Sequence, residues 1–141
     1  MWVFTLFIIL DTILIGMGMG VPIFPILFGF FVGWFIVKYI TARTSSVPQV
    51  FRKVLLYALL TSSVTLFWMV VIWGPTMRLL YDPGRDIANF GIPMILYEPL
   101  ASFIGWIVLM ILVSPFLQFL TTLFGSYLAQ LRWLNKQPNL Q

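Results

Sequence analysis

Apolar side chains fill four long stretches of this chain, and only short polar segments separate them. The stretches run roughly over residues 2–19, 25–40, 54–73 and 99–120. A helix needs about 20 mostly apolar residues to cross the hydrocarbon core of a bilayer. The pattern therefore predicts an all-α membrane protein, a bundle of four transmembrane helices that forms a single integral membrane domain over residues 1–141.

The polar segments define three connections of unequal length. Residues 20–25 contain Gly20, Pro22 and Pro25, which break a helix and favour a tight hairpin between the first two stretches. The second connection, residues 41–49, is short and polar. The third, residues 74–98, is longer, and we expect it to form the external loop.

Composition agrees with a bilayer as the solvent of this chain. Hydrophobic residues make up 61% of the sequence and charged residues 9%, whereas an average soluble domain has about 25% charged residues. The net charge is +4. Because the basic residues flank the apolar stretches and form no patch within a polar surface, we expect no nucleic-acid partner.

The basic residues are distributed unevenly over the connections. Arg78 and Arg85 lie in the long loop, whereas the other six flank the second connection or follow the last stretch. Loops rich in Lys and Arg stay in the cytoplasm. We therefore expect cytoplasmic N and C termini and an external loop, in a multi-pass protein of a prokaryotic cytoplasmic membrane. The six residues are Lys38, Arg43, Arg52, Lys53, Arg132 and Lys136.

The last stretch is longer than a membrane requires. A helix over residues 99–131 would extend about 50 Å, against about 30 Å of hydrocarbon. The sequence predicts a kink at Ser114–Pro115, because Pro115 lacks a backbone donor. Beyond it we expect residues 121–134 to form a cytoplasmic amphipathic extension at the membrane surface, anchored by Tyr127 and Trp133. Its polar positions, counted from the kink, are Gln118, Thr121, Thr122, Ser126 and Gln130.

Small residues recur four positions apart, the spacing at which helices pack closely in lipid. Glycine is also common in membrane helices, so some of these pairs arise by chance. Contacts within one protomer and contacts between protomers both fit the pattern. The pairs are Gly16 with Gly20, Gly29 with Gly33, Ala101 with Gly105, and Gly125 with Ala129.

Asp11 interrupts the first apolar stretch near its middle, where an ionisable group is costly and marks a candidate functional site. It lies roughly 14 Å deep if the helix enters the membrane at Trp2. Hydroxyl groups on the third stretch fall at a similar depth, and one more lies at the kink. These candidate partners are Thr61, Ser62, Thr65 and Ser114.

Three uses of Asp11 remain open from the sequence. A neutral Asp11 can donate a hydrogen bond to a neighbouring helix and act as an assembly contact. A carboxyl group in a low dielectric can instead bind a proton or a cation. A shifted helix register would leave Asp11 in water.

The long loop offers a second candidate surface. Residues 81–86 read as a turn, with Pro83 and Gly84 at its centre. Arg78, Asp82, Arg85 and Asp86 would either form exposed ion pairs in a solvated turn or present an external docking surface.

The chain contains no histidine and no cysteine, which removes the usual general base and nucleophile. No P-loop, dinucleotide motif or carboxylate cluster is present, so we expect no cofactor, no metal and no enzyme. The favoured hypothesis is a non-catalytic accessory or assembly subunit, with the lipid bilayer and other membrane subunits or itself as partners. The alternative is a small homo-oligomeric proton- or cation-coupled transporter or channel that uses Asp11. A lipid-modifying enzyme using Asp11, Asp82 or Asp86 is the third hypothesis.

Overall fold

The computed structural model describes residues 2–18, 20–44, 46–82 and 96–135, and every regular element in these ranges is helical. Two long rods are built from two and three consecutive helical segments, and a shorter helical hairpin precedes them. The hairpin consists of α1 (Trp2–Met17) and α2 (Ile23–Thr41). The first rod joins α3 (Val47–Trp73) to the 3-10 helix η1 (Gly74–Tyr81), and the second joins α4 (Pro99–Val108), the π-helical turn η3 (Leu109–Val113) and α5 (Ser114–Leu134).

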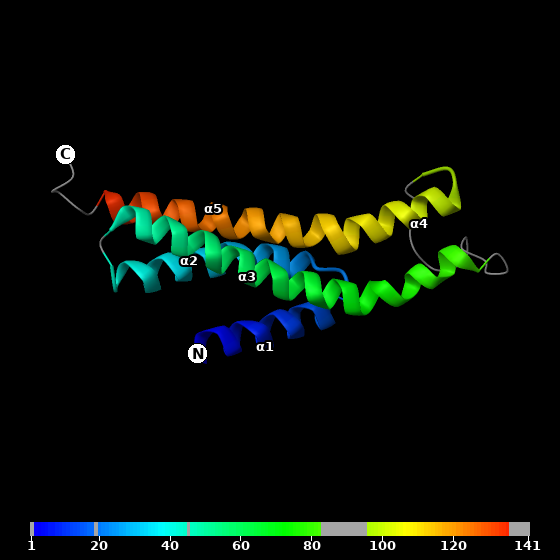
Figure 1. Cartoon of the computed structure of the whole chain (residues 1–141), viewed down its shortest axis with the longest axis horizontal. Coiled ribbons are helices and arrows are strands. Elements are labelled where there is room, and N and C mark those ends of the chain that lie inside the picture. The colour runs from blue at the N-terminus through cyan, green and yellow to red at the C-terminus, as the bar shows by residue number, and fades with distance from the viewer. Residues whose placement is uncertain (1, 19, 45, 83–95, 136–141) are drawn as a thin grey trace.

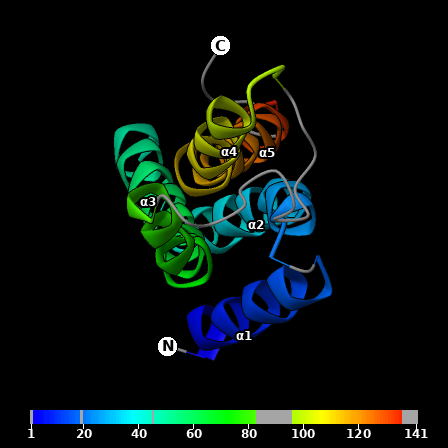
Figure 2. The same ribbon diagram turned by 90° about the vertical axis from the view of Figure 1, so that its right-hand side faces the viewer.

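The two rods lie side by side, and α2 packs along α5 (Figure 1). Three continuous helices are long and apolar enough to cross a membrane, namely Ile23–Thr41, Val47–Tyr81 and Pro99–Leu134. A shorter apolar helix covers Phe4–Met17. The chain is thus an integral membrane protein built as a helical bundle. Figure 2, which looks along the rods, shows α1 beside α2 and α3 at the edge of the bundle.

Polar side chains lie inside this bundle, and large apolar side chains cover its outside. Phe35 and Phe67, for example, are 69% and 61% exposed, whereas Asp11 and Gln118 are 0% exposed. In lipid the hydrophobic effect does not drive apolar groups inward, while polar groups without water must find partners within the protein. The exposed apolar surface is therefore the expected surface of a membrane bundle.

The α2–α5 contact depends on glycine. A Cβ at Gly33 would overlap the Thr122 carbonyl oxygen, and a Cβ at Gly29 would lie 2.6 Å from the Thr121 hydroxyl oxygen. The close approach lets hydroxyl groups reach the opposite backbone. Thr121 Oγ1 donates to the Ile26 carbonyl at 2.6 Å, and Ser126 Oγ donates to the Gly33 carbonyl at 3.1 Å.

The α1–α2 hairpin turns at Gly20, whose φ of 83° lies in the left-handed region that glycine adopts without strain. Trp73 Nε1 donates to the Gly20 carbonyl at 2.9 Å and fixes the turn against α3. Pro22 directly precedes α2 and Pro25 lies in its first turn, where a missing N–H has no helical partner to lose. The turn is shorter than residues 20–25 because Pro25 is already helical.

The last rod contains a π turn that ends directly before Ser114–Pro115. Ser114 Oγ donates to the Leu109 carbonyl at 2.8 Å, and the Ser114 backbone N–H donates to the same carbonyl in the π turn. Residues 121–134 continue α5 along α2 without a separate surface helix.

This result differs from the amphipathic extension that the sequence analysis expected. Thr122 and Ser126 are buried against α2, while Phe124, Tyr127 and Leu131 are exposed. The helix is amphipathic, but its polar side faces the protein: Ser126 Oγ donates to the Gly33 carbonyl of α2, and Thr122 Oγ1 donates to the Gln118 carbonyl of its own helix.

Candidate functional site

Asp11 lies on the inward face of α1. Phe7, Asp11 and Ile15 are all buried, at 7%, 0% and 2% exposure. Their spacing of four residues places them on one side of the helix. The carboxyl group therefore points into the bundle and not into the surrounding lipid.

Two neutral donors from two other helices hold the Asp11 carboxyl group. Thr65 Oγ1 on α3 donates to Oδ2 at 3.0 Å, and Gln118 Nε2 on α5 donates to Oδ1 at 3.3 Å. The lysines and arginines in the described ranges are all exposed. None of them therefore lies buried beside the Asp11 carboxyl group. The Asp11–Thr65–Gln118 cluster joins α1, α3 and α5.

Of the four expected hydroxyl partners, Thr65 is the one that bonds to Asp11. Thr61 Oγ1 donates to the Ala58 carbonyl at 2.9 Å, and Ser62 Oγ donates across to the Pro115 carbonyl at 2.7 Å. Ser114 bonds within its own helix. Depth along the helix predicts which hydroxyls lie level with Asp11. Rotation about the helix axis decides which of them meets the carboxyl group.

Gln118 is a partner of Asp11 that the sequence analysis does not predict, because Gln118 is grouped there with the polar positions of the amphipathic extension. A signal for it does exist. The polar residues Ser114, Gln118, Thr122 and Ser126 recur every four positions through an otherwise apolar helix. In a membrane helix such a polar stripe faces protein.

The Gln118 side chain has one unsatisfied atom. Its Oε1 is buried and has no hydrogen-bond partner among the described residues. An amide presents a donor on one side and an acceptor on the other. Gln118 Nε2 donates to Asp11 Oδ1, as it would to a carboxylate; turned by 180°, the amide would offer Oε1 to a protonated Asp11. The cluster can therefore hold either form of the carboxyl group.

The small-residue pairs have different roles. Gly29 and Gly33 form the α2–α5 contact within the protomer, and a Cβ at Gly125 would overlap the Phe30 carbonyl oxygen in the same contact. Gly20 forms the hairpin turn. Gly16 is exposed, and a Cβ there would meet nothing within 4 Å. Ala101 and Gly105 are half-buried on α4.

The expected docking loop is partly described. Arg78 lies exposed on η1, and Asp82 is exposed directly after it. Arg85 and Asp86 lie outside the described residues. Within the described ranges, no group of three or more His, Cys, Asp or Glu residues could hold a metal ion.

No protein-family model matches this chain, and no curated protein or solved structure matches it either.

Proposed function

We propose that this protein crosses the membrane four times, with both termini in the cytoplasm, and acts as a non-catalytic accessory or assembly subunit of a larger membrane complex. The orientation is supported by the end of the bundle where α2 ends, α3 begins and α5 ends (Figure 1). Lys38, Lys53 and Arg132 belong to these segments. Basic residues gathered at one end mark the cytoplasmic side.

The opposite membrane boundary is proposed at two tryptophans. The rings of Trp73 and Trp106 meet edge to face with centroids 6.2 Å apart, and Trp73 also bonds to the hairpin at Gly20. Tryptophan is enriched at membrane interfaces. Lys53 and Trp73 are separated by about 30 Å along α3, the thickness of a hydrocarbon core.

The subunit proposal is supported by the part of the bundle that lies beyond this boundary. Segments η1 and α4 extend past the α1–α2 hairpin (Figure 1). They continue about 10–16 Å beyond the two tryptophans. Apolar side chains remain exposed there, including Met77 at 42% and Leu100 at 48%. Hydrocarbon does not cover side chains at that distance, so we propose that another protein subunit does.

The native mass of the protein, extracted from its own membrane in mild detergent, tests this proposal. We expect a particle well above the 16.2 kDa of one chain, containing other polypeptides in fixed ratio. The double variant Met77→Ser, Leu100→Ser removes apolar surface from the projecting end, which η1 and α4 form. It should release these polypeptides. A matched control, Leu59→Ser with Leu112→Ser, changes exposed leucines on the same two rods within the membrane.

The control variant should retain the complex. A wild-type particle that contains one chain alone would contradict the proposal, and so would a complex that survives in both variants. A defined homo-oligomer would instead favour the second candidate function.

The second candidate is a small homo-oligomeric transporter or channel coupled to a proton or cation through Asp11. The unpartnered Gln118 Oε1 favours it, because with the amide turned by 180° a protonated Asp11 would donate a hydrogen bond to this oxygen. Proton-dependent flux into liposomes containing wild-type protein, lost in Asp11→Asn, would support this function. Equal flux in both proteins would eliminate Asp11 as the coupling group.

A further inference from the structure

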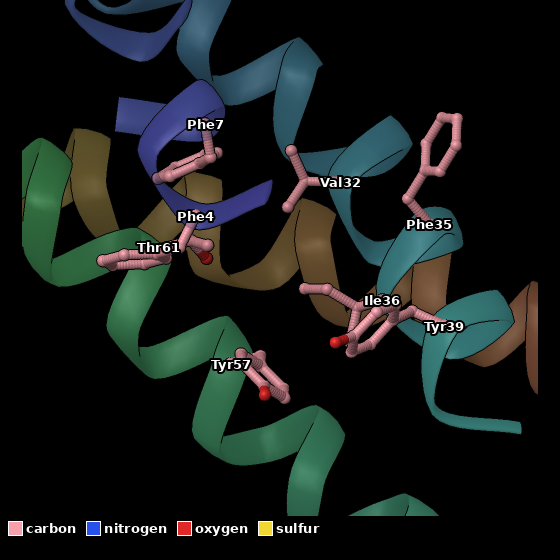
Figure 3. Close-up of a pocket in the computed structure, with 8 residues that line it drawn as sticks. All are labelled: Phe4, Phe7, Val32, Phe35, Ile36, Tyr39, Tyr57 and Thr61. Atoms are coloured by element: carbon pink, nitrogen blue, oxygen red, sulfur yellow. The ribbon is translucent and has the colours of Figure 1, made fainter. Parts of the chain in front are cut away.

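A cavity of about 230 Å³ lies between α1, α2 and α3 (Figure 3). Its walls are mainly aromatic and aliphatic, with Phe7 from α1, Ile36 from α2 and Tyr57 from α3 among them. Apolar cavities of about 150 Å³ stay dry and accept apolar guests. A larger cavity with walls of this kind therefore suits an apolar occupant better than water.

The cavity reaches the lipid-facing side of the bundle. Two residues of its lining, Phe35 and Tyr39, are exposed at 69% and 42%. Figure 3 shows Tyr39 and Tyr57 pointing toward one another from α2 and α3. Since this surface is covered by bilayer, the apolar molecule that can reach the cavity is an acyl chain.

A cation lies beside the cavity. The Arg43 guanidinium stacks on the ring of Tyr39, with Cζ 3.9 Å from the ring centroid, and its Nη1 donates to the Tyr39 hydroxyl. Arg43 is exposed, and it follows the end of α2. Its remaining N–H groups are suited to a phosphate, which arginine binds with two parallel hydrogen bonds.

We propose that this cavity holds one acyl chain of an anionic phospholipid whose phosphate contacts Arg43. The acyl chain fills the space between α1 and the α2–α3 pair. This inference is independent of the subunit and transport proposals, since it concerns neither the projecting end nor Asp11.

The headgroup has to supply the selectivity. An acyl chain already surrounded by lipid gains no hydrophobic free energy by entering the cavity. Attraction between one arginine and an anionic headgroup corresponds to a preference of about fivefold over a zwitterionic lipid. We therefore expect selective retention of one anionic lipid per protomer.

Native mass spectrometry can test the proposal on full-length protein taken from nanodiscs of equal parts phosphatidylglycerol and phosphatidylcholine. Wild type should retain one phosphatidylglycerol in about fivefold excess over phosphatidylcholine. Arg43→Gln should remove the headgroup preference. Val32→Trp places a large ring in the cavity and should remove the bound lipid of either kind.

Two control variants separate this site from general lipid binding. Arg52→Gln removes an exposed charge at the same end of the bundle, and Val70→Trp adds a ring on an exposed part of α3 that does not line the cavity. Both should bind lipid like wild type. Retention without headgroup preference in wild type would overturn the proposal, as would identical retention in Arg43→Gln and Arg52→Gln. Because Arg43 is exposed, that comparison does not depend on the Val32→Trp variant folding.

Discussion

At the scale of the residue, the structure depends on how polar atoms find partners away from water. Asp11 is the clearest case, because its carboxyl group is fully buried and receives donors from Thr65 and Gln118. A buried carboxylate without partners costs several kcal/mol, and hydrogen bonds offset part of that cost. Asp11 thus links three helices, whichever protonation state it adopts.

Substitution of Asp11 separates the hydrogen bonds from the charge. Asp11→Asn retains an acceptor for Thr65, and its amide can donate to Gln118 Oε1 once the Gln118 amide is turned. The free energy of unfolding should therefore change by less than about 1 kcal/mol. Asp11→Leu leaves both partners unsatisfied and should cost about 1–3 kcal/mol for each. Thermal unfolding in mild detergent, followed by tryptophan fluorescence, measures the difference. Equal losses in the two variants would mean that the carboxylate charge itself is required for stability.

At the scale of the element, glycines on both helices bring α2 and α5 into close contact. Gly29 and Gly33 remove side chains from one helix and Gly125 removes one from the other, so the backbones approach and hydroxyl groups bridge them. Van der Waals contact and these bonds replace the hydrophobic effect as the source of helix association in lipid.

Alanine substitution at two glycines should have opposite outcomes. In Gly33→Ala the new Cβ would overlap Thr122 O and lie 2.8 Å from Ser126 N. The helices must separate, at a cost of about 1–3 kcal/mol. Gly16→Ala meets nothing within 4 Å and gains up to about 1 kcal/mol of helix propensity. Melting temperatures of the two variants in one detergent test this, and a loss at Gly16 as large as at Gly33 would contradict it.

At the scale of the whole molecule, the lengths of the helices do not match. Val47–Tyr81 and Pro99–Leu134 contain 35 and 36 residues, whereas Ile23–Thr41 contains 19. The rods must tilt, curve or leave the membrane. We have proposed that they leave it at the η1–α4 end, on the side of the membrane opposite the cytoplasmic termini.

Single cysteines can report that orientation, because the chain has none of its own. With a membrane-impermeant thiol reagent, Tyr81→Cys should react in intact cells. Ser46→Cys and Asn135→Cys should react only after the cells have been permeabilised. Trp2→Cys should behave like Ser46→Cys if α1 crosses the membrane. Reaction of Trp2→Cys in intact cells would leave three crossings in place of four.

The helical membrane class and the approximate positions of the helices can be predicted from the sequence, because apolar stretch length and proline placement act locally. The sequence also identified Asp11, Thr65, Gly29 and Gly33 as residues of interest, since a carboxyl group or paired glycines in an apolar helix are visible without a partner. Which helix surfaces meet depends on the packing of the whole bundle. Rotation of each helix about its axis selected Thr65 over Thr61 and Ser62, and it brought Gln118 to Asp11 and the α5 hydroxyls to α2. These contacts follow from the packing of whole helices against each other. Residue spacing within one segment of the chain does not predict them.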